Sequence, residues 1–220
     1  MMEAVGRKKA HRLFNRASAD RFVKGRRPQE DLVTSAVFGS IDLLTGPARR
    51  RALELVVGKK AINALCERHD DTAEIGIEFW KRLERPAIGP TVEPDILLNL
   101  GKHTVVVEVK WHSQLGTDQL ASQVEAVRDN NLGPIAIVAL GATDQPATIA
   151  RVPCTSRTWR DVSGAIQTAL NSNDSLEVNL SKWVARVFAF LHETDNGRIF
   201  NGLLEPSDLD EVQFVFQERM

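Results

Sequence analysis

The stretch Glu93–Trp111 constrains the fold of this chain more than any other segment. It contains two runs of residues that favour β-strands, Ile96–Leu100 and Thr104–Val109. Gly101 and Lys102 separate the runs and suit a two-residue type II′ turn, in which glycine takes the first central position. The sequence therefore predicts a tight antiparallel hairpin at this point.

The two faces of the predicted hairpin differ in chemistry. With a two-residue turn, Asp95 faces Glu108 directly, and Lys110 shares their face because side chains alternate along a strand. A longer loop over residues 99–102 would make the two carboxylates diagonal neighbours on that same face. The opposite face is wholly apolar and consists of Ile96, Leu98, Val105, Val107 and Val109. We expect that apolar face to lie in the core.

Two carboxylates that face each other across a hairpin repel, so a partner is needed to offset their charge. A divalent cation is such a partner, because Mg²⁺ binds through one or two carboxylates and keeps several waters. Carboxylate ligands suit Mn²⁺ as well. The sequence therefore predicts a Mg²⁺ or Mn²⁺ site at Asp95 and Glu108.

Pro94-Asp95, followed on the next strand by Glu108-Val109-Lys110, resembles the PD-(D/E)XK motif of restriction-endonuclease-like nucleases. In that family the Asp and Glu hold Mg²⁺, often with the carbonyl group of the residue between Glu and Lys, and the Lys orients or activates the attacking water. The resemblance implies that Asp95, Glu108 and the backbone of Val109 bind metal. It also implies that Lys110 acts in catalysis.

Two flanking helices resemble elements of the same family. Pro28 opens a helical pattern that contains Glu30, and many of these nucleases carry a Glu in the helix ahead of the sheet. Gln119 resembles the Gln that contacts substrate or orients the site in several branches, although Gln123 stands where many branches have an aromatic residue. The alternatives are a Glu30 carboxylate favoured by the helix dipole and a solvated pair of amides, Gln119 and Gln123, which lie four residues apart on one helix face.

The remaining patterns predict an ordered series of helices and strands. Helices are expected over 28–44, 48–67 with a break at Gly58, 118–129, 158–170 and 176–193. Strands are expected over 72–84, 96–100, 104–109, 135–140, 151–154 and within 208–217, with a loop over 85–91. This order predicts an α/β protein, bordering on α+β, with a restriction-endonuclease-like mixed central sheet flanked by helices.

Charge is distributed unevenly along the chain. Residues 1–27 carry nine Lys and Arg against two acidic residues, a net charge of +7, while the whole chain has −1 and the remainder therefore −8. We interpret 1–27 as a basic arm, 28–170 as a nuclease-like core and 171–220 as a C-terminal extension with a helix and an acidic, strand-forming tail. Candidate nucleic-acid contacts are Arg26, Arg27, Arg157 and Arg160, and a solvated surface is the alternative.

Composition limits the class of protein. Apolar residues make up 43% and charged residues 26% of the chain, which is typical of soluble globular proteins. Two cysteines fit a reducing compartment, and neither a membrane span nor a signal peptide is recognisable. We expect a cytoplasmic protein with nucleic acid as its partner, DNA before RNA, and no membrane contact. A homodimer and a larger complex both stay open.

These observations predict a metal-dependent phosphodiesterase, a nuclease that acts in defence against phage or in DNA repair. A different hypothesis is a catalytically inactive module of the same fold that binds nucleic acid or protein. The small net charge favours that module, because duplex binding usually involves a basic face. A third, purely structural interpretation pairs Glu93 with Lys110 as an ordinary cross-strand ion pair.

Overall fold

The computed structural model of the chain describes residues 30–67, 73–85, 89–110, 115–142 and 145–170, together with Lys182. Three predictions from the sequence lie outside these residues: the basic arm with Arg26 and Arg27, the helix over 176–193 and the strand within 208–217. The candidate site and its flanking elements lie inside them.

The predicted hairpin forms the centre of the structure. Strands β4 (Ile96–Leu100) and β5 (His103–Val109) pair antiparallel, with Ile96 opposite Val107 and Leu100 opposite His103. Gly101 has a φ of 58°, and Lys102 is not among the residues with positive φ, as a type II′ turn requires. The shorter of the two possible loops is therefore correct, and the register places Asp95, one residue before β4, opposite Glu108.

A six-stranded mixed sheet extends the hairpin in the order β1-β4-β5-β6-β8-β7. Strand β1 (Gly76–Phe79) pairs antiparallel with β4, whereas β6 (Gly133–Leu140) and β8 (Val152–Arg157) continue β5 in parallel. Helix α6 (Thr117–Asp129) forms the crossover between β5 and β6. These findings confirm the predicted α/β class and the parallel pairing after the crossover helix.

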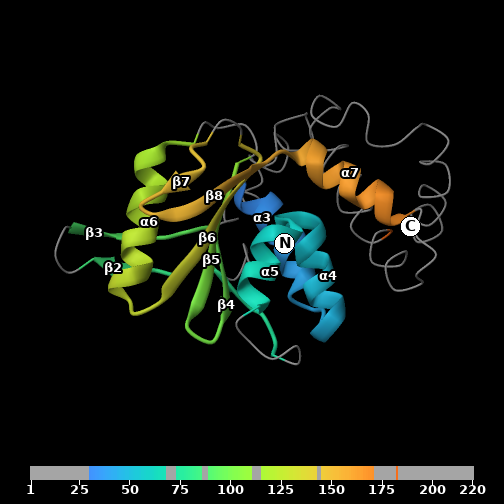
Figure 1. Cartoon of the computed structure of the whole chain (residues 1–220), viewed down its shortest axis with the longest axis horizontal. Coiled ribbons are helices and arrows are strands. Elements are labelled where there is room, and N and C mark those ends of the chain that lie inside the picture. Colours follow the sequence, from blue (N-terminus) through green and yellow to red (C-terminus); the bar gives the residue numbers. More distant parts are fainter. Residues whose placement is uncertain are drawn as a thin grey trace, which may run out of the picture.

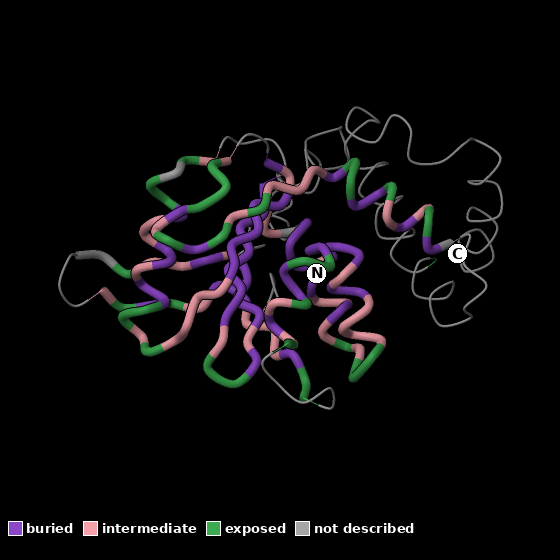
Figure 2. Tube along the Cα trace, viewed as in Figure 1, coloured by how far each residue is buried: buried purple, intermediate pink, exposed green. Residues whose placement is uncertain are grey.

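Helices cover both faces of the sheet (Figure 1). On one face, α5 (Lys59–Cys66) packs on the strands together with α3 (Glu30–Ile41) and α4 (Gly46–Val57), and α7 (Trp159–Leu170) packs against α4; α6 covers the other face. The five aliphatic side chains of the apolar hairpin face are all buried in the larger core. Figure 2 shows the buried residues concentrated along the strands between these helices. The sheet is therefore the middle of three layers.

Two predictions for residues 72–91 are wrong. The single strand expected over 72–84 is two short strands, β1 and β2 (Leu83–Arg85), separated by Trp80 with a φ of +44°. Trp80 is buried beside Phe79, with the ring centroids 5.7 Å apart, and burying the indole turns the chain out of the sheet. The expected loop contains β3 (Gly89–Val92), because pairing with β2 outweighs the preference of Gly and Pro for loops.

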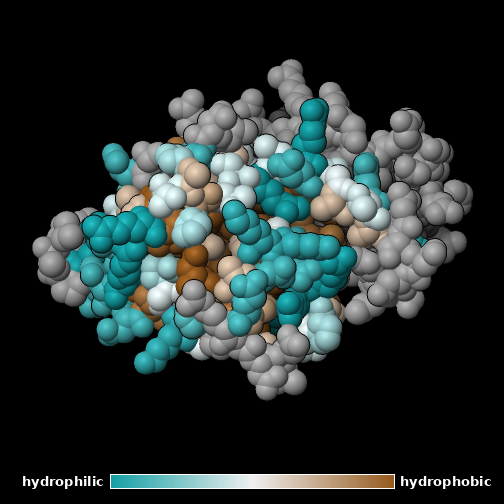
Figure 3. All heavy atoms as spheres, in the orientation of Figure 1, coloured by the Kyte–Doolittle hydropathy of each residue, from teal (hydrophilic) through white to brown (hydrophobic). Residues whose placement is uncertain are grey.

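The remaining boundaries agree with the sequence more closely. Gly58 separates α4 from α5 at a φ of 103°, as the predicted break requires. The expected short strand over 151–154 is longer, since β8 reaches Arg157 and pairs with a two-residue strand, β7 (Thr148–Ile149). Hydrophilic side chains cover most of the described surface in Figure 3. No helix in the described part of the chain is long and apolar enough to cross a membrane.

Candidate active site

The predicted site residues meet at one edge of the sheet. Asp95 directly precedes β4, Glu108 and Val109 end β5, and Lys110 follows at once. The backbone N–H of Lys110 donates to the carbonyl of Leu140 at 2.7 Å, which ties this point to the end of β6. The carboxyl ends of parallel strands are the usual position of ligand sites in α/β sheets. The hairpin therefore delivers its charged residues to the edge where a ligand site is expected.

Asp95 is fixed by its own backbone and side chain. Its carbonyl accepts a hydrogen bond from the N–H of Trp80 at 3.1 Å, and Oδ2 accepts one from the N–H of Val109 at 2.8 Å. Burial of the carboxyl group, followed by the negative charge of Glu108, raises the pKa of Asp95 to about 8. Without a cation, this site therefore favours a proton on one of its two acids.

Glu108 is 2% exposed and is surrounded by N–H donors. Oε1 accepts from Lys110 Nζ at 2.7 Å and from Gln119 Nε2 at 2.5 Å, and Oε2 accepts from Gln123 Nε2 at 2.6 Å. A carboxylate has about four lone-pair positions, so roughly one of them, on Oε2, is left for another ligand. Gln119 and Gln123 occupy successive turns of α6, which explains how one helix reaches both oxygens.

Lys110 links the hairpin to the first described helix. Its Nζ lies 3.5 Å from Oε2 of Glu30 at the start of α3, and the residue is 8% exposed. Burial opposes the charged form, but the charge and hydrogen bond of Glu108, then the charges of Glu30 and Asp95, outweigh it and raise the pKa of Lys110. A lysine acts as a general base only when its pKa is lowered. Lys110 is therefore a fixed positive charge here.

The backbone of Lys110 is held as firmly as its side chain. Its carbonyl accepts a hydrogen bond from Trp159 Nε1 at 2.8 Å, so this core residue also fixes the position of Lys110. Gly141 passes the same carbonyl with a φ of 82°, and a Cβ there would lie 1.8 Å from Lys110 O and 2.5 Å from Trp159 Nε1. Only glycine fits at this position, and the close approach fixes where Lys110 stands.

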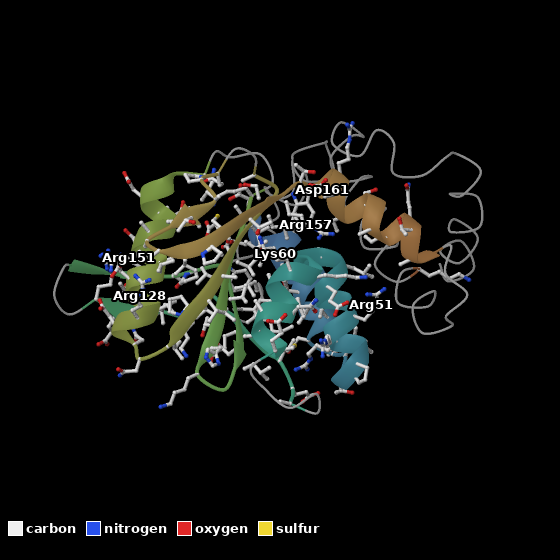
Figure 4. The ribbon with its side chains drawn as sticks, viewed as in Figure 1. Arg51, Lys60, Arg128, Arg151, Arg157 and Asp161 are labelled. Atoms are coloured by element: carbon white, nitrogen blue, oxygen red, sulfur yellow. The ribbon has the colours of Figure 1, made fainter. Side chains whose placement is uncertain are left out.

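The predicted arginine contacts do not form one cluster. Arg157 is half-buried, and its Nη2 donates to the carbonyl of Leu55 at 2.6 Å, so it joins β8 to α4 inside the protein. This engagement argues against Arg157 as a phosphate contact. Arg151, the exposed residue before β8, lies apart from Arg157, which ends that strand (Figure 4). Arg160 is exposed in the first turn of α7, where its contact with phosphate stays a prediction.

The donor set fits a magnesium ion through two carboxylates. No group of three or more His, Cys, Asp or Glu side chains suited to a metal occurs among the residues that the structure describes. Mg²⁺ does not require such a cage, because it binds through one or two carboxylates and retains waters. Burial and then the negative charge of Glu108 raise the pKa of Asp95, and a bound cation would oppose both effects by favouring the charged carboxylates. Asp95 and Glu108 are therefore the residues able to hold the ion.

Two contacts at the site differ from what the sequence indicated. Gln123, expected as a departure from an aromatic residue or as half of a solvated amide pair, bonds directly to Glu108. Its spacing of four residues from Gln119 was the available signal. Glu93, the partner of Lys110 in the purely structural interpretation, lies 3.8 Å from Arg82, while Lys110 pairs with Glu108 and Glu30. The ammonium group of Lys110 therefore contacts two carboxylates, which an ordinary cross-strand pair with Glu93 does not explain.

The chain was compared with models of known protein families, with curated proteins and with solved structures, and none of them matches it. The resemblance to PD-(D/E)XK nucleases therefore depends on the motif residues themselves. The contacts among Asp95, Glu108, Lys110, Gln119 and Glu30 are the structural observations that bear on it.

Proposed function

We propose that this chain is a Mg²⁺-dependent nuclease that hydrolyses phosphodiester bonds of nucleic acid, with DNA as the expected substrate. One observation carries the proposal: an acid pair, Asp95 and Glu108, and a buried charged lysine, Lys110, meet at one sheet edge. Glu30 and Gln119, which come from separate helices, contact the same group. Mn²⁺ is the alternative ion, because its ligand preferences are similar.

The topology around the site supports a restriction-endonuclease-like fold. Strands β1, β4 and β5 form an antiparallel meander, and α6 then crosses to the parallel strand β6. A helix that precedes the sheet, α3, brings Glu30 to the site. This is the order that the sequence resemblance implies. A role in phage defence or DNA repair belongs to the proposal by analogy alone.

The mechanism assigns a distinct task to each residue. Asp95 and Glu108, with the carbonyl of Val109, would hold the ion, which when bound polarises the scissile phosphate and lowers the pKa of a water ligand. Lys110 stays protonated, so it stabilises negative charge on the phosphate or orients the water rather than removing a proton. Gln119 is exposed and bonded to Glu108, which suits an amide that also meets the substrate.

The experiment is cleavage of DNA and RNA by the purified full-length chain with Mg²⁺ or Mn²⁺. We expect cleavage that a chelator stops, and losses of about 100-fold or more for Asp95→Ala and for Lys110→Ala in folded protein. Lys102→Ala is the matched control, because Lys102 is exposed at the hairpin turn, away from the site end of the strands. Equal activity in all three variants would assign the cleavage to another site or to a contaminant.

An inactive nucleic-acid-binding module is the second candidate. The observation that favours it is the engagement of Lys110 by both Glu108 and Glu30, which leaves a phosphate competing with two carboxylates for one ammonium group. In that case the wild-type chain would bind nucleic acid without cleaving it at any Mg²⁺ or Mn²⁺ concentration. Binding would then be unaffected by Lys110→Ala.

A further inference from the structure

Helix α6 presents two glutamines to a single carboxylate. Gln119 Nε2 bonds to Oε1 of Glu108, and Gln123 Nε2 bonds to Oε2 at 2.6 Å. Gln119 is exposed, whereas Gln123 is 1% exposed and cannot meet a macromolecular substrate in the structure as it stands. The two amides therefore donate hydrogen bonds to different oxygens, and together they fix the rotation of the Glu108 carboxylate.

The oxygen atom of the Gln123 amide indicates a specific role for this residue. Its Oε1 atom is buried and has no hydrogen-bond partner among the described residues. An unpaired buried acceptor costs free energy, and an aliphatic side chain of similar size would fill the same space without that cost. The bond to Glu108 is the compensation that this structure shows. Gln123 is thus better explained by what it does to Glu108 than by packing.

We propose that Gln123 is a positioning residue that holds the Glu108 carboxylate in the orientation that binds the metal ion. This inference depends on the proposed function, because it assumes a cation at Asp95 and Glu108. Lys110 and Gln119 both bond to Oε1, so Gln123 supplies the only donor to Oε2 among the residues described. Without it, the carboxylate is free to pivot about Oε1, and the lone pair left for the ion loses its fixed direction.

The test compares Gln123→Met with wild type, since methionine has a similar length and no N–H donor. Calorimetric titration with Mg²⁺ and with Mn²⁺, without nucleic acid, should show about 10-fold to 100-fold weaker binding, the usual effect of removing a residue that orients a metal ligand. Circular dichroism should show a folded variant. Ser122→Ala is the matched control, because Ser122 is half-buried on the same helix and directed elsewhere.

A second measurement follows the Gln123 amide of the wild-type chain directly, with variants used only to assign its signal. The side-chain amide signal of Gln123 in a nitrogen–proton correlation spectrum, assigned by its absence in Gln123→Met or Gln123→Leu, should shift when Mg²⁺ is added. The amide of Gln167 on α7 serves as the internal reference and should not move. If the Met variant does not fold, the Leu variant or direct sequential assignment identifies the signal.

The outcomes separate the two proposals. Wild-type binding of Mg²⁺ with unchanged affinity in Gln123→Met, or with an unmoved Gln123 signal, would overturn the positioning role and leave the nuclease proposal intact. No binding of either ion by wild type would overturn the metal site and the positioning role with it. Weaker binding in Gln123→Met with normal binding in Ser122→Ala supports both.

Discussion

The two faces of the β4–β5 hairpin use the same backbone for opposite purposes. The face formed by Ile96, Leu98, Val105, Val107 and Val109 is completely buried in the larger core, beneath the helices on that side of the sheet. The other face buries Leu97 and Val106 in a smaller cluster with α6 and then ends in Asp95, Glu108 and Lys110. A single residue step along a strand moves a side chain from one face to the other. Because side chains alternate along the two strands, the residues that stabilise the core lie on one face and the candidate site residues lie on the other.

This separation has a thermodynamic consequence. Apolar burial on the first face contributes about 25 cal/mol per Å² to folding, without any partner requirement. On the second face, the raised pKa of Asp95 shows that folding disfavours its charged form. Residues at the site are therefore expected to lower the stability of the metal-free protein, whereas residues one step away raise it.

The largest effect should come from truncating the apolar face. Leu98→Ala should lower the free energy of unfolding by about 4 kcal/mol, because Leu98 is fully buried and its surroundings in the larger core cannot collapse into the cavity. Leu97→Ala is the matched comparison, equally buried but packed in the small cluster near the short β2 strand. We expect a loss of about 2–3 kcal/mol there, since that cluster can relax further.

Urea denaturation followed by fluorescence measures both values. The slope of unfolding free energy against urea should stay unchanged, so that the shift of the midpoint reports stability alone. If Leu97→Ala costs as much as Leu98→Ala, the two faces contribute equally and the comparison fails.

A substitution on the site face should have the opposite sign. Asp95→Asn should raise the stability of metal-free protein at pH 8 by about 2 kcal/mol, a value that allows for the partial exposure of the residue. The amide oxygen of Asn can still accept the hydrogen bond from Val109, so the backbone contact persists. Added Mg²⁺ should stabilise wild type and not the variant.

The pH dependence follows from the direction of the shift. The pKa of Asp95 rises from 3.8 to about 8 on folding, so between these values the folded chain holds a proton that the unfolded chain has released. Wild-type stability should therefore fall as pH rises from about 4 to about 8, and Asp95→Asn should lose this decline. Thermal unfolding across that range with a chelator present measures it, and parallel curves for the two proteins would contradict the assignment.

The hairpin was predictable because its determinants are local. Strand-forming runs and a Gly-Lys turn lie within 15 residues, and they fixed the register that brings Asp95 opposite Glu108. Trp80 shows the limit of local patterns: the sequence predicts one strand over 72–84, but the buried Trp80 has a positive φ and β1 ends at Phe79. The β2–β3 pair is a local hairpin, and it was missed because the Gly and Pro residues of this segment favour a loop.

The site residues also fall into two groups, those that the sequence predicts and those that depend on contacts between distant segments. The motif gave Asp95, Glu108 and Lys110, and the resemblance added Glu30 and Gln119, which the structure brings into contact with Lys110 and Glu108. Neither the motif nor the resemblance indicated that Gly141 and Trp159 would contact the Lys110 carbonyl, because these residues come from distant strand and helix ends. Arg157 was predicted as a phosphate contact from its charge, and charge alone does not show that its guanidinium turns inward to the carbonyl of Leu55.

The smallest expected effect concerns the start of α7, which packs against α4 but begins at the protein surface. Thr158 Oγ1 accepts a hydrogen bond from the N–H of Asp161 at 3.1 Å, and the Thr158 N–H donates to Asp161 Oδ2 at 2.7 Å, so the two residues form a capping box. Thr158→Ala should cost about 1 kcal/mol. Thr168→Ala, an exposed position on the same helix, is the control and should change stability by less than about 0.5 kcal/mol.

The same cap has a pH signature opposite to that of Asp95. Hydrogen bonds from the Thr158 hydroxyl and N–H lower the pKa of Asp161 below its ordinary value of 3.8. The stabilisation is therefore present above that pH and is lost as pH falls below it. Urea midpoints of wild type and Thr158→Ala should differ at pH 7 and converge in more acidic buffer. A difference that stays constant would mean that the Thr158 hydroxyl stabilises α7 without the Asp161 charge, and the cap would then act through its backbone bond alone.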